Sequence, residues 1–101
     1  MARIGLVSPD LLFGSKVEGA LRVAGHDVVH GTDGVEAVVI DLTHGDVPAP
    51  PEGVPSLGFY SHVEQDVRRT AEAAGYDMVV PRSRMNREGA ALVERLLAGG
   101  S

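Results

Sequence analysis

The chain has 101 residues, of which 44% are hydrophobic and 23% charged, as in one ordinary globular domain without repeats or low-complexity tracts. Its 9 Lys and Arg against 14 Asp and Glu give a formal charge of -5, which argues against broad nucleic-acid binding. The absence of cysteine excludes disulfides and thiolate metal sites, and no apolar run is long enough to span a membrane, so we expect a cytoplasmic protein without a membrane partner.

The first 42 residues alternate between strand and helix patterns. The apolar run RIGLV, residues 3–7, ends at Ser8-Pro9 and predicts a buried strand. Residues 10–24 carry apolar side chains at a spacing of three to four, which predicts an amphipathic helix that stops at Gly25. Residues 26–30 and 36–42 predict the second and third strands.

The link between the second and third strands allows two interpretations. Asp33-Gly34 between two apolar runs is typical of a hairpin, which would make these strands antiparallel. Only residues 31–36 separate them, too few for a helical crossover. In extended form they would span about 20 Å, just enough to run back along a short sheet and keep the strands parallel. Both interpretations stay open.

The second half continues the alternation. Residues 46–55 contain four prolines and predict a loop or extended segment. We expect strands at residues 56–62 and 76–80, an amphipathic helix at residues 63–75, and a helix at residues 86–100 capped by Asn86. This order predicts an α/β fold with a mainly parallel sheet, in one domain that covers residues 1–101.

Several short motifs occur in a telling order. Asp41 follows the run AVVI, Ser61 ends GFYS and Arg82 follows VVP. The phrase HGTDGVEA precedes Asp41, and AEAAGYDMVV lies between Ser61 and Arg82. Together they resemble the receiver domain of bacterial response regulators. The resemblance implies an open, flavodoxin-like sheet of five parallel strands in the order 2-1-3-4-5. It also implies that Asp41 is the phosphoacceptor and that Ser61 and Arg82 hold the switch positions beside it.

The chain departs from that family in two ways. Ser8 and Pro9 stand where the family places the acidic pair that holds Mg²⁺, with Asp10 one residue later, and Arg82 replaces a lysine. The links at residues 31–36 and 46–55 leave the second and third helices shortened or missing. We therefore expect apolar residues of the central strands to be left exposed. A homodimer, or the proline segment folded over the sheet, would have to cover them.

The leading hypothesis is a stand-alone, degenerate receiver-like regulatory module, not an enzyme, that binds a protein partner or itself without phosphoryl transfer or cofactor. In this hypothesis Arg82 holds the carboxylate of Asp41. One alternative is a phosphorylatable regulator that uses Asp41 and Mg²⁺. Another is a small-ligand or metal-binding protein with its site at the carboxyl ends of the strands, where His44 and His62 are weak metal candidates.

Overall fold

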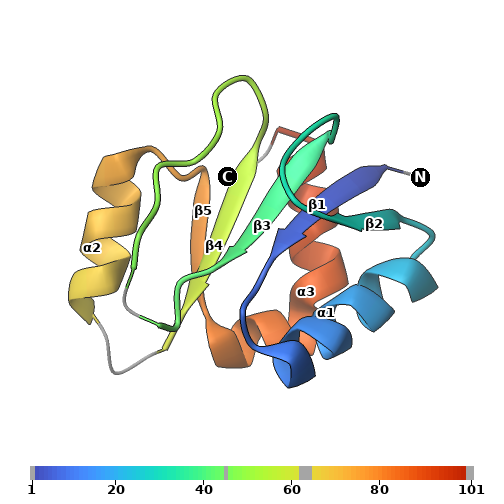
Figure 1. The fold of residues 1–101 in the computed structure, drawn as a ribbon, viewed down its shortest axis with the longest axis horizontal. Coiled ribbons are helices and arrows are strands. Elements are labelled where there is room, and N and C mark those ends of the chain that lie inside the picture. Colours follow the sequence, from blue (N-terminus) through green and yellow to red (C-terminus); the bar gives the residue numbers. More distant parts are fainter. Residues whose placement is uncertain (1, 45, 62–64, 100–101) are drawn as a thin grey trace.

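One five-stranded sheet organises the chain, and the computed structural model describes residues 2–44, 46–61 and 65–99 (Figure 1). In chain order the elements are β1 (Arg3–Val7), α1 (Leu11–Val23), β2 (Asp27–His30), β3 (Ala37–Asp41), β4 (Ser56–Tyr60), α2 (Gln65–Ala74), β5 (Met78–Pro81) and α3 (Arg82–Leu97). The strands lie in the order β2-β1-β3-β4-β5 and every neighbouring pair is parallel. The predicted flavodoxin-like topology is confirmed.

The hairpin interpretation of residues 31–36 is wrong. β2 and β3 lie on opposite sides of β1 and each pairs with it in parallel, so the link must carry the chain back across β1. Gly31 and Gly34 turn the backbone with φ of 133° and 68°, values that other residues rarely adopt. The amide of Glu36 then donates to the carbonyl of Arg3 at 2.8 Å, which fixes the start of β3 beside β1.

Side chains alternate between the two faces of the sheet, as the two-residue period of a strand requires. On the first face, α1 and α3 cover a core that includes Ile4, Leu6, Val39 and Phe59. On the second face, α2 covers a smaller core together with the connecting segments at residues 31–36, 42–44 and 46–55 (Figure 1).

The expected exposure of the central strands is wrong. Val38 is fully buried and Ile40 is 4% exposed on the second face, because the proline-rich segment folds over them. Val47 and Val54 of this segment pack against that core, and the hydroxyl of Tyr76 donates to the carbonyl of Pro48 at 2.8 Å. Of the two covers that we considered, the proline segment is therefore present, and the homodimer stays a prediction.

The connecting segments lie very close to the sheet at two glycines. A Cβ atom at Gly5 of β1 would lie 2.2 Å from the carbonyl oxygen of Gly31, and one at Gly58 of β4 would lie 2.6 Å from the Leu42 side chain. Real Cβ atoms do not come this close to other atoms. Position 5 therefore needs glycine because its neighbour is backbone, and a side chain at position 58 would force Leu42 to shift. At Gly5 and Gly58 no side chain separates the strand from the connecting segment. The segments can therefore lie close to the sheet and cover the second face without two further helices.

Helix α3 begins earlier than predicted. It starts at Arg82 directly after Pro81, whose φ of -67° and ψ of 149° end the strand, and Asn86 lies one turn inside it instead of capping it. Met85 buries its side chain in the first core and holds this extra turn in place. A kink follows at Glu88, where φ is -128°, so the predicted start at Asn86 lies two residues before the kink.

Two polar contacts tie the outer elements to the sheet. The buried ring of His26 accepts a hydrogen bond from the Ala2 amide at 3.2 Å through Nδ1, and its Nε2 faces Glu94 of α3. At the outer edge of β2, the guanidinium of Arg22 donates to the carbonyl of Val28 at 3.0 Å. Among the helices of the described ranges, none is long and apolar enough to cross a membrane.

The close approach at Gly5 predicts a large effect from one methyl group. We expect Gly5→Ala to lower the free energy of unfolding by about 3 kcal/mol or more, because a backbone carbonyl cannot move aside as a flexible side chain can. Gly19→Ala is the matched control. Position 19 is exposed on α1 with open space around it, so that variant should gain about 0.5 to 1 kcal/mol. Urea denaturation of both variants measures the difference, and equal effects would contradict the packing described here.

Candidate functional site

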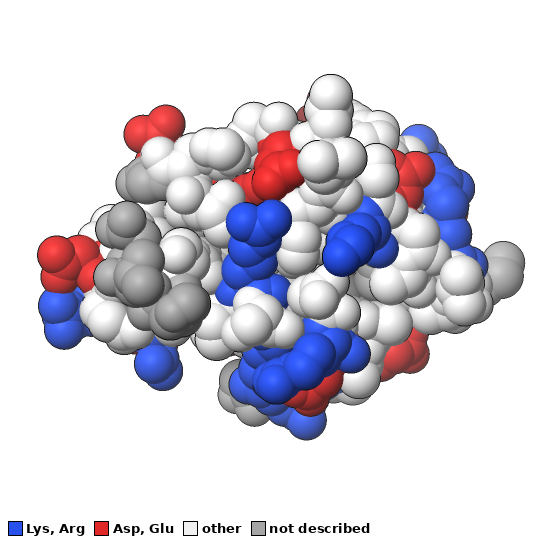
Figure 2. All heavy atoms as spheres, turned by 90° about the horizontal axis from the view of Figure 1, so that it is seen from below, with Lys and Arg blue, Asp and Glu red and all other residues white. Residues whose placement is uncertain are grey.

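The carboxyl ends of the parallel strands meet at one end of the molecule. The register that pairs Val7 with Ile40 brings Ser8 beside Asp41, and the register that pairs Tyr60 with Pro81 places Ser61 and Arg82 at the ends of neighbouring strands. Viewed towards this end, Lys and Arg side chains gather over the middle of the surface although the whole chain is acidic (Figure 2).

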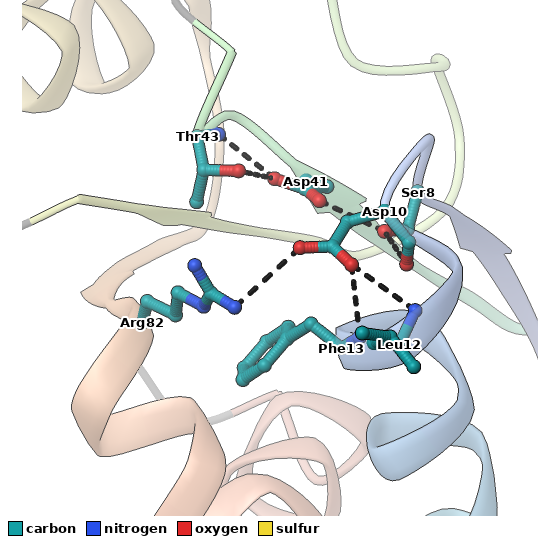
Figure 3. Close-up of polar contacts among 7 residues, drawn as sticks. All are labelled: Ser8, Asp10, Leu12, Phe13, Asp41, Thr43 and Arg82. Carbon is teal, nitrogen blue, oxygen red and sulfur yellow. Dashed lines mark hydrogen bonds and ion pairs between the residues drawn. The ribbon is translucent and has the colours of Figure 1, made fainter.

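Asp41 ends β3 and is 8% exposed. Its Oδ2 accepts a hydrogen bond from the Ser8 hydroxyl at 2.8 Å. Its Oδ1 accepts from the Thr43 amide at 2.8 Å and from the Thr43 hydroxyl at 2.5 Å (Figure 3). Both carboxylate oxygens are therefore engaged by neighbours from the same end of the sheet, which offsets the cost of burying the charge.

Asp10 caps helix α1. Its Oδ1 accepts from the amides of Leu12 and Phe13, each at 3.1 Å, and so caps α1. The hydrogen bond from the Phe13 amide, aided by the charge of Arg82, lowers the pKa of Asp10 below its ordinary value of 3.8, although partial burial opposes the shift. Asp10 is thus charged at neutral pH and committed to the first turn of the helix.

Arg82 does not hold Asp41 as expected. Its Nη2 lies 3.4 Å from Oδ2 of Asp10, and its guanidinium lies over the Phe13 ring, 4.4 Å from the ring centre (Figure 3). Arg82 opens α3, and from there the side chain extends over Phe13 of α1 towards the cap of that helix. The hydroxyls of Ser8 and Thr43 and the amide of Thr43 hold the Asp41 carboxylate in place of Arg82.

The remaining predicted residues lie around this group. Ser61 lines a hollow beside Arg82 and makes no hydrogen bond with the rest of the described chain. His44 is exposed, and its charge contributes to the lowered pKa of Asp10. His62 lies outside the described residues. No group of three or more His, Asp or Glu side chains in the described ranges could hold a metal ion.

Sequence reasoning missed Thr43 and Phe13. Thr43 follows Asp41 by two residues, and an Asp side chain often bonds the backbone two residues on, so this pattern could have identified it. Phe13 gave no such signal. Phe13 lies in the core, as the apolar spacing of residues 10–24 predicts, but its contact with Arg82 depends on how α1 and α3 pack.

The contacts of Asp41 predict that its carboxylate supports the fold. We expect Asp41→Asn to lower the free energy of unfolding by about 1 to 2 kcal/mol, since charge-assisted hydrogen bonds are replaced by neutral ones. Asp33→Asn is the control, because Asp33 is exposed and makes no hydrogen bond or ion pair with other described residues. Urea denaturation at neutral pH compares the two. An Asp41 variant as stable as the Asp33 variant would refute the assignment.

Comparison with known proteins adds to this picture at the level of the fold. No protein-family model matches the chain, and no curated protein sequence matches it significantly. Solved structures do match. The receiver domain of a Francisella response regulator superposes with a TM-score of 0.77 at 11% identity, over 98% of both chains.

Two further structures agree with that match. A CheY-like receiver domain protein from Methanospirillum hungatei has a TM-score of 0.77 at 12% identity, over 98% of this chain and 95% of that one. A LuxR-family two-component response regulator from Aurantimonas has a TM-score of 0.71 at 24% identity, over 99% of this chain and 87% of that one. Sequence identities this low show a similarity of fold and do not show a shared function. The chain therefore has the receiver-type fold of response regulators, as the sequence resemblance predicted.

Proposed function

We propose that the chain is a receiver-like regulatory module that acts by binding a protein, without phosphoryl transfer to Asp41. The observation that carries this proposal is the set of contacts around Asp41. Ser8 occupies the place beside Asp41 where the resemblance implies an acidic ligand for Mg²⁺, and its hydroxyl donates to the very carboxylate that would have to attack a phosphoryl group.

Phosphoryl transfer to an aspartate needs a free carboxylate oxygen and positive charge to neutralise the transferred group. Mg²⁺ requires near-octahedral oxygen ligands and is bound in proteins through carboxylates. The carboxylates at this end of the sheet do not fit that requirement, because Asp41 is engaged by Ser8 and Thr43 and Asp10 by α1 and Arg82. These contacts support a role that does not use the metal.

The surface next to this site supports protein binding. Leu11 and Leu12, in the first turn of α1, are 82% and 85% exposed. Two consecutive exposed leucines lose unfavourable contact with water when a partner covers them. A second copy of the chain can supply a matching apolar surface, so we propose a homodimer formed through the start of α1.

The proposal that Asp41 is not phosphorylated is tested by restoring an acidic pair at positions 8 and 9. Wild type incubated with acetyl phosphate and Mg²⁺ should gain no phosphoryl group in intact-mass spectra. Ser8→Asp combined with Pro9→Asp should gain measurable Mg²⁺ affinity and some labelling at Asp41, because it adds acidic ligands and removes the Ser8 hydrogen bond.

Ser8→Ala is the control for that experiment. It removes the Ser8 hydrogen bond from Oδ2 of Asp41 without adding an acid, and it should stay unlabelled. Labelling of wild type that disappears in Asp41→Asn would overturn the proposal in favour of a phosphorylatable regulator.

The dimer proposal is tested by sedimentation velocity over a range of protein concentrations. Wild type should dimerise, and Leu11→Glu with Leu12→Glu should be monomeric, because charges at both positions cannot be covered by an apolar partner. Glutamate is favourable in the first turn of a helix, so this variant should fold. Val23→Glu, at the other end of α1 and 91% exposed in wild type, should dimerise as wild type does. A wild type that is monomeric at every concentration would exclude the homodimer.

A further inference from the structure

A hollow lies between α1 and the start of α3, at the carboxyl end of the sheet. Its volume is about 390 Å³, within the range of pockets that hold small molecules. We call it the α1–α3 hollow. It is lined by Phe13, Lys16, Ser61, Arg82, Ser83 and Asn86. Neither Asp41 nor Ser8 lines it, so it is separate from the hydrogen-bonded group around Asp41.

The charge of the hollow is positive. Among the described residues that line it, two are cations and none is an acid, in a chain whose formal charge is -5. Lys16 is the only lysine of the chain, and it has no hydrogen bond or ion pair within the described ranges. Unlike the arginines of the i,i+4 pairs on α1 and α2, its ammonium group pairs with no acid among the described residues.

Arg82 is held in place with donors to spare. The Phe13 ring supports one face of its guanidinium, and the 3.4 Å contact with Asp10 uses Nη2 alone. A guanidinium carries several N–H donors in a rigid plane, the geometry that suits two oxygens of a phosphate. The cation is thus oriented before any ligand arrives, which lowers the entropy cost of binding.

The neutral groups of the hollow are also donors. Ser61 and Ser83 contribute hydroxyls and Asn86 contributes an amide. Helix α3 begins at this place without a side-chain cap, so the amides of its first turn lack the acceptor that Asp10 provides for α1. These amides add to a set of donors that the side chains already form.

We propose that the α1–α3 hollow binds the phosphate group of a small phosphorylated molecule, non-covalently and apart from Asp41. Two cations line a space of that size together with hydroxyl and amide donors, and a tetrahedral dianion satisfies more of these donors than a planar carboxylate does. The site makes the chain a ligand-responsive module, and it does not depend on whether the chain dimerises or whether Asp41 can be phosphorylated.

The experiment is a titration of isotope-labelled protein followed by NMR, without Mg²⁺ and at constant ionic strength. Inorganic phosphate and glycerol phosphate are the two probes, with chloride as the salt control. Saturable shifts at Lys16, Ser61, Ser83 and Asn86 are expected with at least one phosphate probe and not with chloride. Saturation by both probes identifies the phosphate group itself as the ligand. Saturation by glycerol phosphate alone identifies a phosphate monoester.

Variants then locate the site. Lys16→Gln and Arg82→Gln should each weaken binding about tenfold, because each removes a charged donor. Arg95→Gln, an exposed position elsewhere on α3, should bind as wild type does. Lys16 is exposed, so its variant should fold even if the Arg82 variant is impaired. Asp41→Asn should bind normally.

Three results would overturn the proposal. They are the absence of saturable shifts with either phosphate probe, equal weakening in the Lys16 and Arg95 variants, and loss of binding in Asp41→Asn.

Discussion

The close contact between the connecting segments and the second face of the sheet is the constraint on which the rest of this structure depends. The carbonyl of Gly31 lies where any side chain at position 5 would have to be. The side chain of Leu42 lies in the corresponding place at Gly58. Because the cover is this thin, two short segments can bury Val38 and Ile40 without the helices of a thicker layer. The five parallel strands then stay in register, and their carboxyl ends deliver Ser8 to Asp41.

Local patterns in the sequence predicted most of the elements, because strands and amphipathic helices leave a periodicity that neighbouring residues share. The direction of β3 could not be predicted. Asp33-Gly34 is a local hairpin signal, whereas pairing with β1 is decided by contacts more than thirty residues apart. The start of α3 was missed for a similar reason, since the burial of Met85 against distant strands adds a turn that no capping residue announces.

Of the candidate site, the sequence located the strand ends but not the partners of their side chains. Ser8, Asp10, Asp41 and Arg82 do meet, because parallel strands end at the same edge. Which acid Arg82 pairs with depends on its direction from the first turn of α3, and no spacing encodes that direction. The result is two neighbourhoods. Both carboxylate oxygens of Asp41 accept hydrogen bonds, and among the described residues around the hollow beside Lys16 the cations outnumber the acids.

The contact between Arg22 and Val28 has a consequence for how this protein avoids uncontrolled polymerisation. Among the described strands β2 lies at the end of the sheet and pairs with β1 alone, so its other side is an edge of the kind that can pair with a strand from another molecule. Arg22 occupies the outward carbonyl in the middle of that short strand, and Asp27 and His30 place polar, exposed side chains at its two ends. A strand from a neighbouring molecule could not easily donate to the Val28 carbonyl, because Arg22 already donates to it. Growth of the sheet from one copy into the next is thereby disfavoured.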